Sequence, residues 1–140
     1  MTRNDPAAAW RVLLCHKHPV SARLHFLVPE QGGVLLPRAL PRLAVVSESE
    51  QGPVVQSHPA MALRELQGML GVNVDLEWVD AFHLHMETPG ELVAIYLAAL
   101  PGYDLVEPPP RTRWIQLPQS VGMPWLDREV LRRAYEVLIG

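Results

Sequence analysis

The segment ELVAIYLAAL, residues 91–100, is apolar at almost every position. A strand with one face in water alternates polar and apolar side chains, whereas a strand covered on both faces does not. The segment therefore predicts a central strand of a sheet. Residues 75–86 (DLEWVDAFHLHM) do alternate, which predicts one long strand with its larger apolar side chains on one face: Leu76, Trp78, Phe82, Leu84 and Met86. Because Thr88-Pro89-Gly90 can turn the chain, the two segments are expected to form a hairpin.

Additional strands are expected from shorter apolar or alternating segments. They lie at residues 9–15, 23–28 and 112–117. Residues 34–46 contain Pro37 and Pro41, so we expect short extended pieces there, followed by a polar loop at residues 47–57.

Two segments have the pattern of a helix. Residues 125–138 carry their apolar side chains on one stripe, which predicts an amphipathic helix that packs on the sheet. A second helix is expected to begin at Ser57-His58-Pro59, because serine can cap a helix and proline is tolerated in its first turn. It is expected to end at Leu70, because Gly71 can adopt the left-handed conformation that terminates helices.

Composition limits the classes of function. A length of 140 residues suits a single domain, residues 1–140. The net charge of -3 and the scattered Lys and Arg residues argue against a nucleic-acid partner. Cys15 is the only cysteine, so an internal disulfide or a Cys-based zinc site is not expected. No stretch approaches the eighteen apolar residues of a membrane span and no signal peptide is evident, so the expected location is the cytoplasm.

The helix sequence MALRELQGMLGV, residues 61–72, has two distinct faces. At about 100° per residue, one narrow stripe should face the core: Leu63, Leu66 and Leu70. Met61, Glu65, Gly68 and Met69 gather on the other side. Since only one of these four is charged, this second face is expected to meet protein or a recess. Glycine inside a helix costs about 1 kcal/mol relative to alanine. The presence of Gly68 therefore needs a reason, which is either a close neighbour that leaves no room for a side chain or historical drift of the sequence.

Residues 64–72 resemble the second half of the Nudix box. In that motif an arginine and a glutamate are followed by an aliphatic residue, two paired glutamates, a glycine and a second aliphatic residue. The positions retained here are Arg64, Glu65, Leu66, Gly71 and Val72, whereas the paired glutamates fall on Gly68 and Met69. The family's earlier glutamate falls on Gln56 and its leading glycine on Glu50.

The resemblance extends to the order of elements along the chain. Leu36-Pro37 is similar to the leucine-proline step before the box, although its spacing to Arg64 is about eleven residues longer than in the family. Arg113-Trp114 and the helix at residues 125–138 follow the family's order after its hairpin. The resemblance implies a Nudix-like α/β/α sandwich with a mixed β-sheet.

The resemblance also implies a reaction, which is the hydrolysis of nucleoside diphosphates linked to another group with Mg²⁺ or Mn²⁺. In the family the arginine at the position of Arg64 orients the paired glutamates. Such ions prefer carboxylate ligands and bind thioethers poorly. With Glu65 alone on the helix between Met61 and Met69, we expect this activity to be impaired or lost.

Three functions remain open from the sequence. The first is a degenerate Nudix protein that binds a nucleotide-like small molecule or a protein. The second is an active, divergent hydrolase in which Glu65, assisted by Arg64, and the loop residues Glu48 and Glu50 hold the metal. The third is a self-associating domain such as a homodimer.

Other side chains are weaker candidates for a site. The pairs His83/His85 and His16/His18 each share a strand face and could bind zinc if the fold brought them together. Glu87 and Glu91 could contribute to a metal site rebuilt from loops. Four aromatic residues could stack a nucleobase, although aromatic residues in strands more often belong to the core: Trp78, Phe82, Tyr96 and Trp114.

Overall fold

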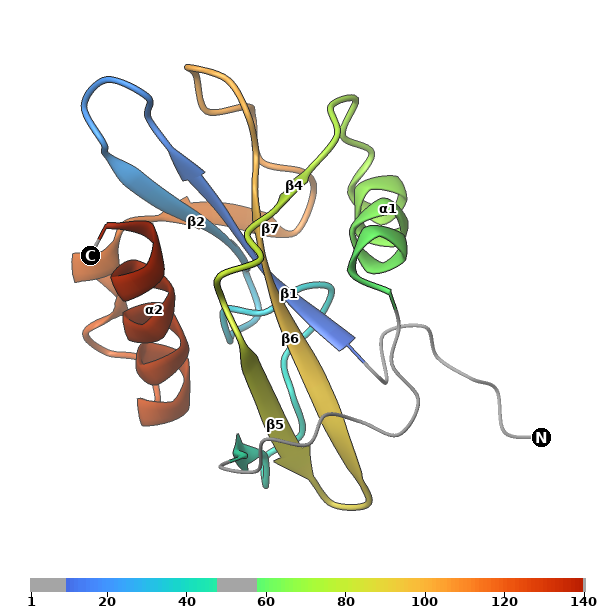
Figure 1. Cartoon of the computed structure of the whole chain (residues 1–140). Helices are drawn as coiled ribbons and strands as arrows, with labels where there is room; N and C mark the ends of the chain where they lie inside the picture. The colour runs from blue at the N-terminus through green and yellow to red at the C-terminus, as the bar shows by residue number, and fades with distance from the viewer. Residues whose placement is uncertain (1–9, 48–57, 140) are drawn as a thin grey trace.

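The computed structural model describes residues 10–47 and 58–139 of the 140-residue chain. These residues form a mixed sheet with helices on both of its faces (Figure 1). In chain order the elements are β1 (Trp10–Lys17), β2 (Leu24–Pro29), β3 (Val45–Val46), α1 (Pro59–Leu70), β4 (Glu77–Trp78), β5 (Leu84–Thr88), β6 (Glu91–Ala99), β7 (Thr112–Ile115), the 3-10 helix η1 (Leu117–Ser120) and α2 (Trp125–Leu138). The bounds of α2 and the end of α1 are those predicted from the sequence.

The sheet is built around two parallel strands. Its order is β3-β5-β6-β1-β2-β7, and β4 pairs with the second half of β6. β1 and β6 are parallel, whereas the remaining pairs of described strands are antiparallel. Residues 93–98 of β6 are all buried. The prediction that this segment is a central strand is confirmed.

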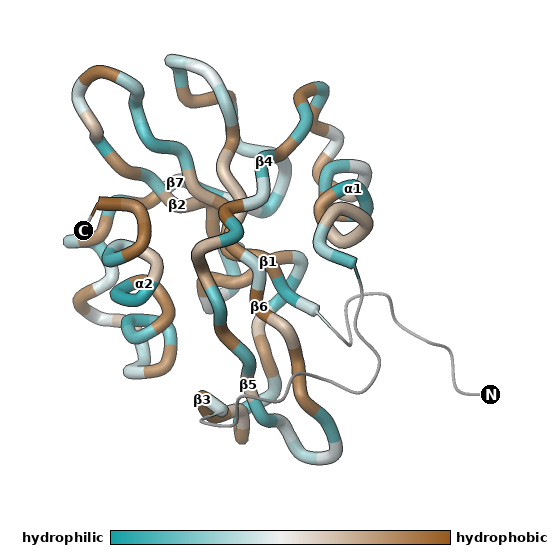
Figure 2. The backbone as a smooth tube through the Cα atoms, in the orientation of Figure 1, coloured by the Kyte–Doolittle hydropathy of each residue, from teal (hydrophilic) through white to brown (hydrophobic). Residues whose placement is uncertain are grey.

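Each face of the sheet is covered by one helix, as Figure 1 shows. The core beneath α1 includes Trp10, Val12, Leu14, Leu27, Ala62, Leu63 and Leu66. The core beneath α2 includes Leu13, Cys15, Phe26, Ile95, Leu97, Val130, Leu131 and Ala134. Successive residues of β1 enter opposite cores because side chains alternate along a strand. In Figure 2 hydrophobic and hydrophilic residues alternate along α2, as expected for an amphipathic helix. The predicted α/β/α sandwich is confirmed.

The prediction of one long strand at residues 75–86 is wrong. The segment includes β4 and the beginning of β5, two short strands that both pair with β6. Leu84 lies six residues after Trp78, whereas their partners Ile95 and Ala98 are three residues apart, so part of the segment leaves the ladder. The segment thus has three more residues than the stretch of β6 that it follows. An odd number of extra residues places the side chains after them on the opposite face of the sheet. Trp78 consequently lies on the α1 side of the sheet, whereas Phe82 belongs to the core beneath α2.

Smaller differences concern the ends of elements. β1 extends past Cys15 to Lys17, and β7 stops at Ile115 because Leu117 and Pro118 begin η1. Ser57 lies outside the described residues, and His58 is the residue that caps α1. No helix among residues 10–47 and 58–139 has the length and apolar character needed to cross a membrane.

Candidate functional site

The helix that resembles the Nudix box is α1, and its ends are fixed by local interactions. The Nδ1 atom of His58 accepts a hydrogen bond from the backbone N–H of Ala60, at 3.2 Å. Pro59 occupies the first turn, where its missing N–H costs nothing. At the other end Gly71 has a φ of 70° and its N–H donates to the carbonyl of Gln67, at 3.0 Å. The predicted glycine stop is therefore confirmed.

One face of α1 anchors the helix to the sheet. Leu63 and Leu66 are buried against the strands, and Leu70 packs against the same core while remaining partly exposed. Full burial of one leucine side chain contributes roughly 1.5–3 kcal/mol. The core stripe predicted from the helical spacing is correct, and it fixes the direction in which every other α1 side chain points.

The opposite face of α1 is open to solvent. Met61 and Met69 are 59% and 53% exposed, and Glu65 is also exposed. A Cβ atom added at Gly68 would have no heavy atom within 4 Å. The expectation that this face meets protein or a recess is therefore wrong for the described part of the chain, and no close neighbour explains Gly68. This face is exposed because α1 packs on the sheet through its other face only.

The residues on this face do not fit the metal ion that the box resemblance implies. Glu65 is the only carboxylate among the four, and its neighbours are two thioethers and a glycine. Mg²⁺ and Mn²⁺ need several oxygen ligands at short distances. Across residues 10–47 and 58–139 no group of three or more His, Cys, Asp or Glu side chains could hold a metal ion. Glu48 and Glu50, the predicted loop ligands, lie outside the described residues.

The two histidine pairs do not converge. The Nε2–H of His16 donates to the carbonyl of Gly102 at 2.9 Å, and His18 Nδ1 accepts from the N–H groups of Val20 and Ser21. His85 lies on β5 and His83 just before it; burial, and to a smaller extent the nearby His83, lower the pKa of His85. The condition for a zinc site from the four histidines is not met in the described residues, because the fold does not bring the two pairs together into one group of ligands.

The β5–β6 hairpin carries two further candidate carboxylates, Glu87 and Glu91. Ser47 Oγ donates to Glu87 Oε1 at 3.5 Å, and Glu91 lines a cavity on the α2 side of the sheet. Among the described residues, neither forms a metal-binding group with Glu65. A metal site rebuilt from loops would also involve Glu48 and Glu50, which lie outside the described residues, so that hypothesis stays a prediction.

A groove runs between α1 and β4, with a volume of about 470 Å³. Its lining combines polar and apolar side chains from the helix, the following loop and the strand: Leu63, Arg64, Gln67, Asp75, Leu76 and Trp78. The side-chain amide of Gln67 donates to Asp75 Oδ1 at 3.4 Å, which joins the helix to the loop across the groove. Arg64 is exposed and forms no ion pair with any of the described residues.

Trp78 is the aromatic residue that this groove offers to a ligand. Its side chain is 45% exposed although its backbone is paired with β6. Phe82 and Tyr96 are buried, and Trp114 is half-buried with its indole N–H donating to the carbonyl of Val106 at 2.8 Å. Of the four aromatic candidates, Trp78 therefore combines a paired backbone with an open indole face.

The groove has the chemistry to hold a ligand that combines a flat ring with a negatively charged group. An indole face stacks with nucleobases, and a guanidinium pairs with phosphate through two parallel hydrogen bonds. Sequence reasoning named Arg64 and Trp78 separately but did not place them together, and it missed Gln67 and Asp75. No local signal joins these four, because the loop after Gly71 brings β4 beside the helix only in the folded chain.

The comparisons with known proteins support the fold. No protein-family model matches the sequence, and no curated protein matches it. Among solved structures, the chain is similar to the crystal structure of the C. elegans Ap4A hydrolase, with 16% sequence identity and a TM-score of 0.53. The match covers 92% of this chain and 96% of the other. At this identity the similarity concerns the fold, and it confirms that the mixed sandwich is Nudix-like.

Proposed function

We propose that this chain is a Nudix-fold protein that binds a nucleotide-like ligand between α1 and β4 and no longer hydrolyses it through the box helix. The observation that carries the proposal is the solvent-exposed face of α1, where Glu65 stands alone beside Met61 and Met69. Because a single carboxylate does not hold Mg²⁺ or Mn²⁺ firmly, the reaction implied by the family resemblance lacks its metal.

The ligand class follows from the groove lining. The exposed indole of Trp78 would stack with a base, and Arg64 would contact a phosphate at the helix side of the groove. Gln67 and Asp75 supply an amide and a carboxylate that can hydrogen-bond to the edge of a base. The similar solved protein is named for its action on Ap4A, which supports a nucleotide-like ligand here.

Calorimetric titration with ADP and ATP in the presence of EDTA tests the binding. Base stacking is worth about 1–3 kcal/mol, so Trp78→Ala should weaken binding by about 5- to 150-fold. Arg64→Gln should also weaken it. Trp125→Ala and Arg128→Gln are matched controls, because both residues are exposed on α2 at the opposite face of the sheet. Wild-type protein that bound neither nucleotide would contradict the proposal.

An active, divergent hydrolase is the second candidate, favoured by the similarity to a hydrolase fold. In this case Glu65 would act with the predicted loop ligands Glu48 and Glu50, and Mg²⁺ or Mn²⁺ would be the cofactor. A panel of nucleotides incubated with either metal separates the two candidates. Turnover in the wild type that disappears in Glu65→Gln would replace the binding proposal with this one.

A further inference from the structure

Arg11 is a positively charged residue buried at the start of a central strand. Its side chain is only 4% exposed. The Nε–H donates to the carbonyl of Arg38 and an Nη1–H donates to the carbonyl of Trp10, each at 2.9 Å. A guanidinium has five N–H donors, so these two bonds leave part of its hydrogen-bonding capacity unused.

The described residues do not supply a counter-ion in contact with Arg11. None of their carboxylates lies within ion-pair distance of it. Burial lowers the pKa of Arg11, and the more distant charge of Glu91 raises it in part. A buried charge without a close counter-ion is costly, so a folded protein that keeps one usually matches it with an ion or a ligand.

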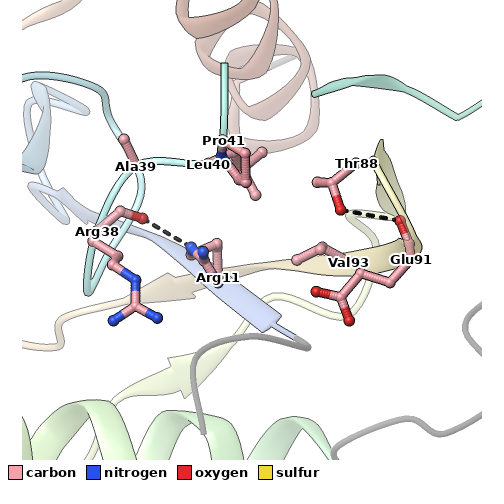
Figure 3. A pocket seen from close by; sticks show the side chains of 8 residues that line it. All are labelled: Arg11, Arg38, Ala39, Leu40, Pro41, Thr88, Glu91 and Val93. Atoms are coloured by element: carbon pink, nitrogen blue, oxygen red, sulfur yellow. Dashed lines mark hydrogen bonds between the residues drawn. The ribbon is translucent and has the colours of Figure 1, made fainter. Parts of the chain in front are cut away.

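A cavity of about 370 Å³ adjoins this guanidinium (Figure 3). Its lining mixes the polar residues Arg11, Arg38, Thr88 and Glu91 with apolar residues that include Leu40 and Val93. Val93 belongs to the core beneath α2, so the cavity lies on the face of the sheet opposite the groove of α1. The two sites are therefore separate.

We propose that this cavity binds a small carboxylate whose charged end pairs with Arg11 and whose apolar part packs against Leu40 and Val93. A carboxylate matches the planar guanidinium through two parallel hydrogen bonds. Glu91 adds negative charge to the wall, which disfavours a doubly charged phosphate more than a singly charged carboxylate. The apolar residues of the lining suit a short branched hydrocarbon chain.

Isovalerate is the probe, and inorganic phosphate is the comparison ligand. We expect saturable binding of isovalerate to the full chain in calorimetry, together with a rise in Tm with concentration, because a ligand that binds the folded state stabilises it. Tighter binding of phosphate than of isovalerate would overturn the assignment of a carboxylate. Absence of saturable binding by both anions would overturn the site.

Two variants test the geometry. Arg11→Lys keeps the charge but loses the planar pair of donors, and it should weaken isovalerate binding at least about tenfold. Leu40→Phe narrows the cavity without altering Arg11, and it should abolish isovalerate binding. It therefore tests the site even if Arg11→Lys fails to fold. Leu43→Phe is the matched control, because Leu43 is 74% exposed and outside the cavity lining. Unchanged binding in both Arg11→Lys and Leu40→Phe would refute the proposal.

This inference is independent of the nucleotide proposal. Trp78→Ala should leave isovalerate binding unchanged, and Leu40→Phe should leave nucleotide binding unchanged. Loss of both ligands in either single variant would show that the two sites are not separate.

Discussion

Restoring the paired glutamates of α1 tests whether the helix still presents a metal-binding face. The variant combines Gly68→Glu with Met69→Glu. A Cβ atom added at Gly68 has no heavy atom within 4 Å, and Gly68 and Met69 are both exposed, so we expect the folded chain to accept both changes without repacking. The substitutions add two carboxylates beside Glu65 on the same face, three and four residues along the helix.

The change in stability without metal should be close to zero. Replacing an interior helix glycine by glutamate gains about 0.5 kcal/mol in helix propensity. Repulsion between each new carboxylate and Glu65 costs about 0.2–0.5 kcal/mol. These contributions nearly cancel. With Mg²⁺ or Mn²⁺ at ten times its Kd, binding should add about 1.4 kcal/mol to the free energy of unfolding. That corresponds to a rise in Tm of roughly 4–7 °C for a chain of this size.

Calorimetric titration with MnCl₂ and thermal unfolding with and without the metal measure this effect. Wild-type protein should show neither saturable binding nor a shift in Tm. The control is Gly68→Gln with Met69→Gln, which has similar side-chain size and helix propensity but no added charge. The reasoning is refuted if the glutamate variant does not bind the metal, or if the wild type and the glutamine control bind it equally well.

Three further predictions concern stability. Leu66→Ala should lower the free energy of unfolding, measured in urea, by about 2–5 kcal/mol, because Leu66 is fully buried. Met69→Ala should change it by less than about 0.5 kcal/mol, because Met69 is exposed. Equal effects of the two substitutions would contradict the assignment of the buried face of α1. Gly71→Ala should destabilise by about 1–2 kcal/mol because its φ is 70°, whereas Gly68→Ala should stabilise by up to about 1 kcal/mol, and the same sign for both would contradict the assigned helix end. Burial and, less strongly, nearby positive charge lower the pKa of His25 from 6.5, so the unfolded chain binds the proton first and stability should fall as the pH drops below about 6.5. His25→Gln should flatten this pH dependence in thermal unfolding, and an unchanged slope would exclude His25 as its source.

Local patterns were sufficient for the elements whose shape depends on their own sequence. The apolar stripe of α2, the glycine stop at Gly71 and the two-sided apolar strand β6 are all confirmed. Each of these features follows from periodicity or from the backbone preference of one residue, and neither changes with distant contacts.

Features that depend on partners far along the chain could not be predicted in the same way. The break between β4 and β5 follows from the register of each strand on β6, which the alternation of residues 75–86 does not encode. The exposure of Met61 and Met69 depends on what else covers α1. Arg11 stood in the sequence as one polar residue within an apolar strand, and only the fold shows that it is buried beside a cavity.

The parallel pairing of β1 with β6 has a consequence for how the chain folds. Trp10 pairs with Ala94, so the centre of the sheet joins segments more than eighty residues apart in sequence. Closing so long a loop costs conformational entropy before the contacts that repay it have formed, which slows folding. During synthesis, β1 and β2 emerge early and can pair as a hairpin, but the two cores cannot close until β6 has left the ribosome. A fragment that ends before β6 should therefore lack a stable fold.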